Sequence, residues 1–328
     1  MRRILRVPLA AAACAAAVGS CVAVLAARPA PGPQRTFRSG VDLVTFGFSV
    51  VDRKGRVVTD LREGDVEVYE DGRKQAVRLF VPCDAQAGGG AARRAPVDLH
   101  LGALLDISGS MDRDLRFARD AAVKFLDGLQ EARDYTLVDF DTEVRVSRFG
   151  QADFARLAER VRGRRAEGDT ALWDAMAVYL DAASQQEGRR VLVVYTDGGD
   201  NASSLPFADL LGLLKASDAT VHVVGLLEHQ SSGAAFDQRA RLQRMADVTG
   251  GQAFFPASAA DLEQAYRQVR AEIDAQYTLG FVSANPGHDG AWRKVEIRVV
   301  RPGLTGARVR TRQGYYAPLG PGGPPPGE

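Results

Sequence analysis

Three short runs of oxygen-bearing side chains follow or precede apolar segments of this chain. The first is Asp106-x-Ser108-x-Ser110, directly after the apolar run 97–105. The second is a Gly-Asp-Thr run that ends at Thr170, and the third is an Asp-Gly-Gly run that begins at Asp197. Loops that follow neighbouring strands of an open α/β sheet converge at its carboxyl edge. These oxygens are therefore predicted to lie together in one site.

The chemistry of such a site is that of a hard cation. Hydroxyls and carboxylates suit Mg²⁺, Mn²⁺ or Ca²⁺, whereas the sequence has no clustered Cys and His of the kind that hold structural zinc. If Ser108, Ser110 and Thr170 contact the ion directly and the carboxylates act mainly through water, the ion keeps net positive character. It would then attract an external carboxylate to an open coordination position.

The elements that would position these residues form an α/β pattern. From Val97 the chain alternates apolar strands with amphipathic helical patterns. The first helix is predicted to end at Leu129. Further helices are predicted to cover 154–162, 172–183, 207–216, 236–248 and 261–275. Strands of continuous Leu and Val between helices are typical of a mostly parallel sheet covered on both faces. Residues 97–275 are thus predicted to form a doubly wound α/β domain.

Strand-like segments flank this domain on both sides. Residues 37–83 alternate apolar and polar side chains, with turns at Lys54-Gly55 and Asp71-Gly72, and residues 277–316 return to the same pattern. Neither segment has enough strands for independent stability. We therefore predict that the two segments pair into one β-sandwich, with the α/β domain inserted between them. Residues 84–96 are interpreted as a linker, and residues 317–328 as a disordered Pro- and Gly-rich tail.

The N-terminus predicts export. Residues 1–27 contain three arginines followed by an apolar run of small residues, and residues 28–36 form a Pro-containing linker. Three outcomes remain open: cleavage near Ala26 or Ala27, lipidation at Cys21 in a sequence that resembles a lipoprotein box, or retention of 9–27 as a membrane anchor, since a span needs about 20 residues. Each places the protein in the periplasm or outside the cell, with membrane contact only through this N-terminal lipid or helix.

Charge and cysteine usage restrict the function further. The 42 basic and 41 acidic residues give a net charge of +1, which argues against nucleic acid as a partner. Cys14 and Cys21 lie in the predicted signal, and Cys83 is the only cysteine in the body of the chain. The mature protein therefore has no intrachain disulfide framework.

The motifs "DISGS", "GDTALWDA" and "VVYTDGGD" resemble, in that order, a von Willebrand factor A domain with a complete metal-ion-dependent adhesion site. The resemblance covers residues 97 to 275. It implies that the metal-site residues are Asp106, Ser108, Ser110, Thr170 and Asp197. The segment "VVDRKGRVVTDLREGDVEVYEDGRKQAVRLF", the "TGGQAFF" loop, "QYTLGF" and "RVRTRQGYY" are similar to the VWFA-related Acidobacterial domain family of exported proteins.

Several of these polar residues could have a structural role and not bind a metal. Asp and Ser in the first motif are also good helix N-caps. Asp112 and Asp114 resemble the acids of a second, adjacent cation site in integrin β-subunits, but Arg113 departs from that pattern, and first-turn acids favour a helix in any case. Asp200 and Asn201 are interpreted as part of a solvated loop, or as residues that tune the site from its rim.

Asp139 and Asp141 flank Phe140 in the strand "LVDFDTEV". One of the two is expected to face solvent and the other to begin a tight turn, and neither is assigned to chemistry.

These observations predict an exported, non-enzymatic protein whose bound cation engages an exposed Asp or Glu of a protein partner. One alternative is a structural or assembly protein of the cell envelope that uses the β-sandwich. Another is a metal-dependent hydrolase, for which only Asp169 or Asp200 is available as general base.

Overall fold

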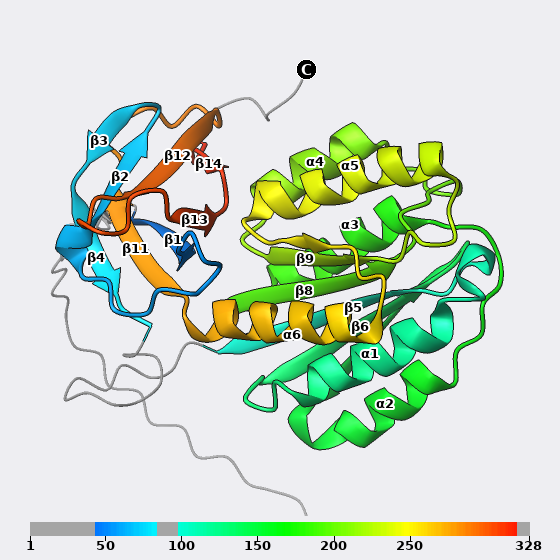
Figure 1. Ribbon diagram of the computed structural model, residues 1–328. Helices are drawn as coiled ribbons and strands as arrows, with labels where there is room; N and C mark the ends of the chain where they lie inside the picture. Colours follow the sequence, from blue (N-terminus) through cyan, green and yellow to red (C-terminus); the bar gives the residue numbers. More distant parts are fainter. Residues whose placement is uncertain (1–42, 84–97, 320–328) are drawn as a thin grey trace, which may run out of the picture. The chain divides into compact units, whose positions relative to one another are not determined.

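A six-stranded, mostly parallel sheet organises the larger part of the fold, as the sequence predicts (Figure 1). This computed structural model describes residues 43–83 and 98–319. The sheet has the order β10-β9-β8-β5-β6-β7, and only the β6–β7 pair is antiparallel. Its strands are β5 (Leu99–Asp106), β6 (Asp134–Phe140), β7 (Val144–Gly150), β8 (Arg189–Thr196), β9 (Thr220–Gly225) and β10 (Ala253–Phe254).

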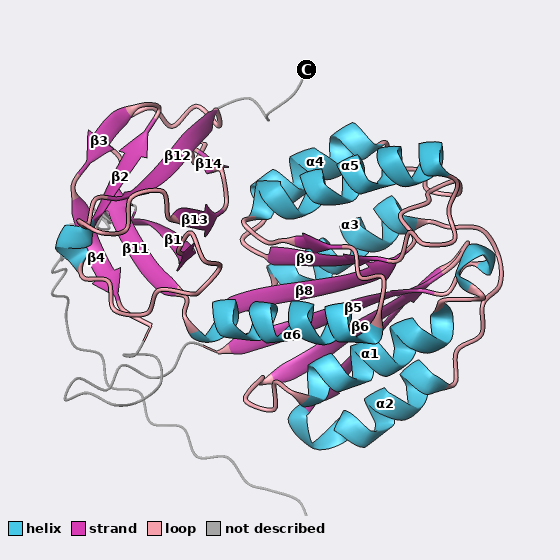
Figure 2. Ribbon diagram, in the orientation of Figure 1, coloured by secondary structure: helices cyan, strands magenta, loops and turns pink. Residues whose placement is uncertain are grey.

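Helices cover both faces of this sheet (Figure 2). One face carries α1 (Leu115–Asp127), α2 (Phe154–Arg162) and α6 (Ala259–Asp274), and the other carries α3 (Leu172–Ser184), α4 (Phe207–Ala216) and α5 (Ser232–Thr249). Every residue of the central strand β5 is buried as a result. This double coverage explains why β5 reads as a continuous apolar run and not as an alternating one.

The flanking segments form two four-stranded sheets with the orders β13-β1-β11-β4 and β14-β12-β2-β3. The N-terminal strands are β1 (Leu43–Val51), β2 (Val66–Glu70), β3 (Arg73–Gln75) and β4 (Val77–Val81), and the C-terminal strands are β11 (Tyr277–Val282), β12 (Trp292–Val299), β13 (Arg308–Thr311) and β14 (Gly314–Tyr316). Each sheet contains strands from both ends of the chain, which confirms the predicted insertion. The residues that the structure describes belong to one compact unit.

The core of the sandwich is aromatic. Phe46 and Phe48 of β1 stack on Phe281 and Tyr277 of β11, with ring centroids 6.2 and 5.2 Å apart. Tyr315 of β14 meets the Phe46 ring edge-on at 6.2 Å. The period-two pattern of β1 and β11 places these rings on one face, where they are fully or nearly fully buried. Contacts between strands from opposite ends of the chain therefore supply much of the core.

Two alternating runs differ from the single strands that they suggest. The run 74–81 breaks at Ala76, so that β3 and β4 lie in different sheets. The run 307–313 ends early, and β13 and β14 likewise enter different sheets. Strands that change sheets form the corners of a sandwich, and short-range alternation does not encode where they bend.

Two predicted boundaries are wrong. Helix α5 begins at Ser232 and not at 236, because the Ser231 hydroxyl accepts a hydrogen bond from the Ala234 amide and caps the helix. The predicted tail begins at 317, yet Ala317 is buried and its amide donates to the Ala291 carbonyl at 2.9 Å. Leu319 forms a bridge with Asp289.

The predicted signal or anchor (1–27), the linker 28–36 and the linker 84–96 lie outside the described residues, as does most of the predicted tail. Among the helices of the described ranges, none has the length and apolar character required to cross a membrane.

Gly102 in the middle of β5 offers a test of how tightly the α/β core is packed. A Cβ atom at this position would lie 2.2 Å from Cε2 of Tyr179 on α3. Gly102→Ala is therefore expected to lower the free energy of unfolding by about 1–3 kcal/mol through overpacking. Urea unfolding of the full chain measures this change.

Gly212 is the matched control, since a Cβ there meets nothing within 4 Å on helix α4. Gly212→Ala is expected to raise the free energy of unfolding by up to about 1 kcal/mol through helix propensity. Equal stability of Gly102→Ala and wild type would contradict the tight packing of Tyr179 on β5.

Candidate functional site

The first predicted motif forms a hydrogen-bonded turn at the end of β5. Asp106 Oδ1 accepts hydrogen bonds from the Ser108 amide at 2.9 Å and from the Ser108 hydroxyl at 2.6 Å. The Ser108 and Ser110 hydroxyl oxygens lie 3.1 Å apart. Asp106 and Ser108 are buried, whereas Ser110 is exposed. The turn thus carries three oxygen-bearing side chains, from a buried carboxylate to an exposed hydroxyl.

The loop that carries Thr170 lies against this turn. The Gly109 amide donates to the Gly168 carbonyl at 3.0 Å, and the Glu167 amide donates to the Ile107 carbonyl at 2.8 Å. Gly168 has φ 73°, a left-handed conformation that favours glycine. Thr170 is buried beyond this bend, at the start of the segment that leads into α3.

The third motif follows β8, which is a direct neighbour of β5. The Thr196 hydroxyl donates to Asp106 Oδ2 at 2.6 Å and so joins the ends of the two strands. Asp197 Oδ1 accepts from the Gly199 amide at 3.0 Å, and Asp197 Oδ2 accepts from Gln230 Nε2 at 2.8 Å. The structure therefore brings all three motifs to the carboxyl edge of the sheet, as the strand order requires.

Two buried carboxylates dominate the electrostatics of this edge. Asp106 is 0% exposed and Asp197 is 2% exposed. Burial, together with the negative charge of Asp197, raises the pKa of Asp106 to about 7. Within residues 43–83 and 98–319, neither carboxylate forms an ion pair with an arginine, lysine or histidine. Two buried carboxylates that repel each other without a cationic side chain are costly unless a cation neutralises them.

The donor set also fits the hydroxyl-rich site that the sequence predicts. In the described part of the chain, no group of three or more His, Cys, Asp or Glu residues is placed to hold a metal. A cation at this edge would depend on the two carboxylates and on the hydroxyls of Ser108, Ser110 and Thr170. This composition suits Mg²⁺, Mn²⁺ or Ca²⁺ and excludes a zinc site of the structural type. The metal-ligating role of these five residues stays a prediction.

Asp200 is half-buried and Asn201 is exposed, as expected for a solvated loop, and both also make hydrogen bonds within the site. Asp200 Oδ2 accepts from the Trp173 amide at 3.0 Å and from the Ser203 hydroxyl at 2.6 Å. Asn201 Oδ1 accepts from the Thr170 amide at 2.7 Å, and Asn201 Nδ2 donates to Asp169 at 3.1 Å. Asn201 thus fastens the Thr170 loop to the loop after β8.

The prediction for Asp139 and Asp141 is partly wrong, because neither faces solvent. Asp139 is fully buried and pairs with Arg164 at 2.8 Å and Arg160 at 3.3 Å. Asp141 begins a tight turn, as predicted, and accepts from the Glu143 amide at 2.7 Å. The arginines that bury Asp139 come from a helix and loop distant in sequence, so strand alternation alone does not reveal them.

The acids considered for a second cation site separate in the structure. Asp114 Oδ2 lies 3.0 Å from Nδ1 of His229, whereas Asp112 is exposed. Asp114 therefore has a partner from the loop before α5.

Two supporting residues were not identified from the sequence. Thr196 directly precedes Asp197, so its position beside the motif was a usable signal. Gln230 lies on the loop between β9 and α5, and nothing near it in sequence marks it as a partner of Asp197. Both hold a carboxylate of the candidate site in place.

The model of the von Willebrand factor type A domain matches residues 100–268, more than half of the chain. The protein belongs to the von Willebrand factor type A domain family. The matched range contains all five candidate site residues of this VWA domain. No curated protein sequence matches the chain.

Solved structures with a similar fold are distant. The PilB minor pilin from Streptococcus sanguinis has 13% identity and a TM-score of 0.45, covering 56% of this chain and 63% of that chain. The pilus adhesin SpaC from Lactobacillus rhamnosus GG has 12% identity and a TM-score of 0.44, covering 70% of this chain and 45% of that chain. A von Willebrand factor type A structure from Catenulispora acidiphila has 17% identity and a TM-score of 0.44, covering 84% and 75%. The chain thus spans less than two thirds of both pilus proteins, and similarity at this level carries no argument about function.

Asn201 provides a test of how the VWA domain positions Thr170. Asn201→Ala removes the acceptor of the Thr170 amide and is expected to weaken Mn²⁺ binding about tenfold or more, as loss of an outer-shell partner does. Calorimetric titration of Mn²⁺ into the full chain measures the affinity. The matched control is Asn285→Ala, because Asn285 Oδ1 accepts from the Gly287 amide at 3.0 Å within the sandwich. Unchanged Mn²⁺ affinity in Asn201→Ala would show that Asn201 does not position the site.

Proposed function

We propose that this protein is an exported, non-enzymatic VWA protein that holds a divalent cation at the Asp106 site and uses it to engage an acidic residue of a protein partner. The observation that carries the proposal is the pair of buried, mutually repelling carboxylates, Asp106 and Asp197, beside the hydroxyls of Ser108 and Ser110. A bound cation would offset this repulsion. The exposure of Ser110 supports access to the site from solvent.

The proposed roles follow from the contacts of each side chain. Ser108, Ser110 and Thr170 would ligate the ion directly through neutral hydroxyls. Asp106 and Asp197 would orient these hydroxyls and the waters of the ion, because hydrogen bonds from Thr196, Ser108 and Gln230 already fix both carboxylates. When bound, the ion supplies positive charge and an open coordination position for a carboxylate. Mg²⁺ suits this arrangement because it keeps several of its waters and needs no complete protein cage.

A binding role is favoured over hydrolysis by the contacts of the two acids proposed as general bases. Asp169 accepts a hydrogen bond from Asn201, and Asp200 accepts hydrogen bonds from the Trp173 amide and the Ser203 hydroxyl. Both carboxylates are thus engaged in holding the loops of the site. A general base must instead be within reach of the proton that it abstracts. Export to the periplasm or the cell surface belongs to the same proposal and is supported by the sequence of residues 1–27.

The first test is calorimetric titration of Mg²⁺ and Mn²⁺ into the EDTA-stripped full chain. Wild type is expected to bind, and Asp106→Ala is expected to lose binding because a central carboxylate is removed. Asp153→Ala is the matched control, since Asp153 is a surface residue paired with Arg156 at 3.2 Å. Circular dichroism of each variant confirms that the fold is kept. Absence of binding in wild type, both alone and with added acetate, would leave the motif oxygens as turn and helix caps.

The second test asks whether the bound cation accepts an external carboxylate. Acetate added to the Mn²⁺-loaded protein is expected to displace a metal-bound water and to lower the water-proton relaxation rate. Ser110→Ala is expected to weaken this response at least tenfold while leaving the urea unfolding curve unchanged, because Ser110 is exposed. An equal acetate response in wild type and Ser110→Ala would contradict the assigned role of Ser110.

A further inference from the structure

Strand β7 forms the longest open edge among the sheets that the structure describes. It is the last strand in the order β10-β9-β8-β5-β6-β7 and has seven residues, Val144–Gly150. The other outer strands are shorter: β10 has two residues, β13 has four, β4 has five, and β3 and β14 have three each. An open edge presents unpaired N–H and C=O groups that can form hydrogen bonds with another strand.

Strand β7 lacks the features that usually protect such an edge. Its pairing with β6 runs without a register shift from the pair Asp134 and Gly150 to the pair Phe140 and Val144, so no β-bulge bends the edge. The strand contains no proline. By contrast β4, the next longest outer strand, has an irregular register with β11. The edge of β7 is therefore regular along its whole length, and another strand can join it.

The two arginines of β7 do not act as free charges on this edge. Arg145 pairs with Asp141 at 3.0 Å and with Glu143 at 3.1 Å. Arg148 donates a hydrogen bond to the Ala182 carbonyl, which directs its guanidinium group toward α3. Charged side chains on an outer strand commonly prevent association. Here contacts within the chain already engage both charges.

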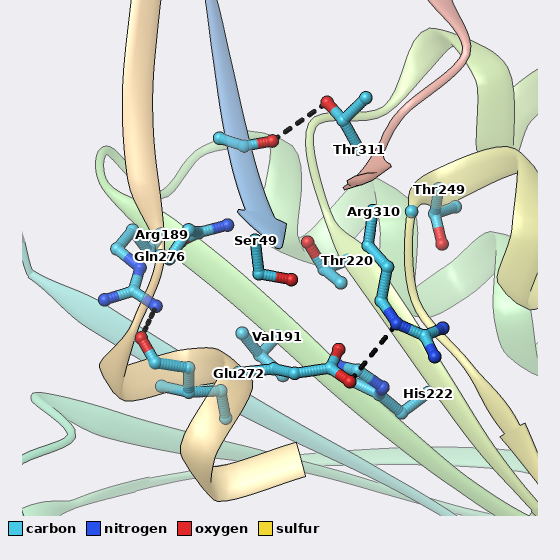
Figure 3. Close-up of a pocket in the computed structure, with 13 residues that line it drawn as sticks. Ser49, Arg189, Val191, Thr220, His222, Thr249, Glu272, Gln276, Arg310 and Thr311 are labelled. Carbon is cyan, nitrogen blue, oxygen red and sulfur yellow. Dashed lines mark hydrogen bonds and ion pairs between the residues drawn. The ribbon is translucent and has the colours of Figure 1, made fainter. Parts of the chain in front are cut away.

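The sandwich contacts the opposite side of this sheet. Glu272 at the end of α6 pairs with Arg310 of β13 at 3.2 Å, and His222 of β9 lines the same pocket (Figure 3). A Cβ atom at Gly250 would lie 2.4 Å from the carbonyl carbon of Thr311, so the main chains meet closely there. These contacts involve β9 and the segment between α5 and β10, which lie on the other side of the sheet from β7.

Two exposed valines lie beside the open edge. Phe149 packs against the core on the α1 and α2 side, so strand alternation places Val146 and Arg148 on the α3 side. Val146 is 40% exposed. Val178 of α3 is 39% exposed and precedes Ala182 by about one turn. Because Arg148 contacts Ala182, Val178 lies near Val146, and the two side chains form an apolar patch next to the edge.

We propose that β7 pairs with β7 of a second copy of this chain, antiparallel about a two-fold axis, and so joins two six-stranded sheets into one. The register that pairs all seven residues places Ser147 opposite Ser147 of the second copy. It places Arg145 opposite Phe149, and an arginine beside an aromatic ring is a favourable pair. It also places Val146 opposite Arg148, so no like charges lie directly opposite each other.

Charges on α2 complement each other across the same axis. Arg156 and Glu159 line a groove beside β7. The Arg156 side chain is 76% exposed and pairs with Asp153 at 3.2 Å, whereas Glu159 forms no ion pair among the described residues. The two-fold axis sets the two α2 helices antiparallel on one face of the joined sheet. Arg156 of one copy is thereby brought toward Glu159 of the other, and such pairs favour the correct register.

This dimer would hold two copies of the candidate site. Because the paired β7 strands run antiparallel, the carboxyl edges of the two sheets point in opposite directions, and the two Asp106 turns lie at opposite ends of the dimer. One dimer could therefore contact partners on both of its sides. The pairing of β7 uses no metal and does not depend on the function proposed above.

The test is the oligomeric state of the full chain, measured by sedimentation velocity over a range of protein concentrations with and without EDTA. Wild type is expected to form a dimer under both conditions. Val146→Lys places a positive charge opposite Arg148 of the second copy, twice in each dimer, and is expected to weaken dimerisation about tenfold. The double variant Val146→Lys/Arg148→Glu places opposite charges there and is expected to restore the dimer. Val300→Lys is the matched control, since Val300 is 46% exposed and lies in the sandwich.

Ser147→Cys tests the register. Opposite residues of an antiparallel pair have Cβ atoms about 4.5–5.5 Å apart, so small movements allow a disulfide. Oxidation is expected to link two copies at position 147, identified by mass spectrometry of the joined peptides, whereas Ser204→Cys, exposed in the loop before α4, is not expected to link. A monomeric wild type at all concentrations, equal dimerisation of wild type and Val146→Lys, or absence of the link at position 147 overturns the proposal.

Discussion

The buried carboxylate of Asp106 is the constraint on which the candidate site depends. It lies at the end of a strand that is covered on both faces, where solvent cannot stabilise its charge. Hydrogen bonds from Ser108 and Thr196 compensate part of this cost, and they also join β5 to its own turn and to β8. A second carboxylate, Asp197, adds repulsion to this cost. The VWA domain thus holds two buried carboxylates in the place where its loops converge.

Hydrogen bonds near the Asp106 turn position the other motif loops. Main-chain hydrogen bonds hold the Thr170 loop against the Ser108–Ser110 turn, and Asn201 binds the Thr170 amide. These contacts use main-chain groups or the side chains of the loops themselves. Groups that are already held in place lose little order when a ligand binds.

Much of this architecture could be predicted from the sequence. Apolar strands separated by amphipathic helices indicate a doubly wound sheet, and the place of each motif after its strand indicates a common edge. The placement of β3 and β4, and of β13 and β14, in different sheets could not be predicted, since a bend such as that at Ala76 depends on packing across the sandwich. The burial of Asp139 and the contact between Gln230 and Asp197 were missed for the same reason. Both depend on partners brought close only by the tertiary fold.

The pairing of β1 with β11 has a consequence for how the chain is made. Leu43 pairs with Val282, so the first strand of the sandwich finds its neighbour only after the entire α/β domain has been synthesised. At typical elongation rates this delay is on the order of ten seconds or more. During that time β2 and β3 can pair with each other, but β1 and β4 lack the strands that they pair with in the native sheet. Unpaired strand edges of this kind are where strands associate wrongly. Folding of the inserted domain brings the two segments together, and a chaperone that shields the early strands would protect the newly made chain.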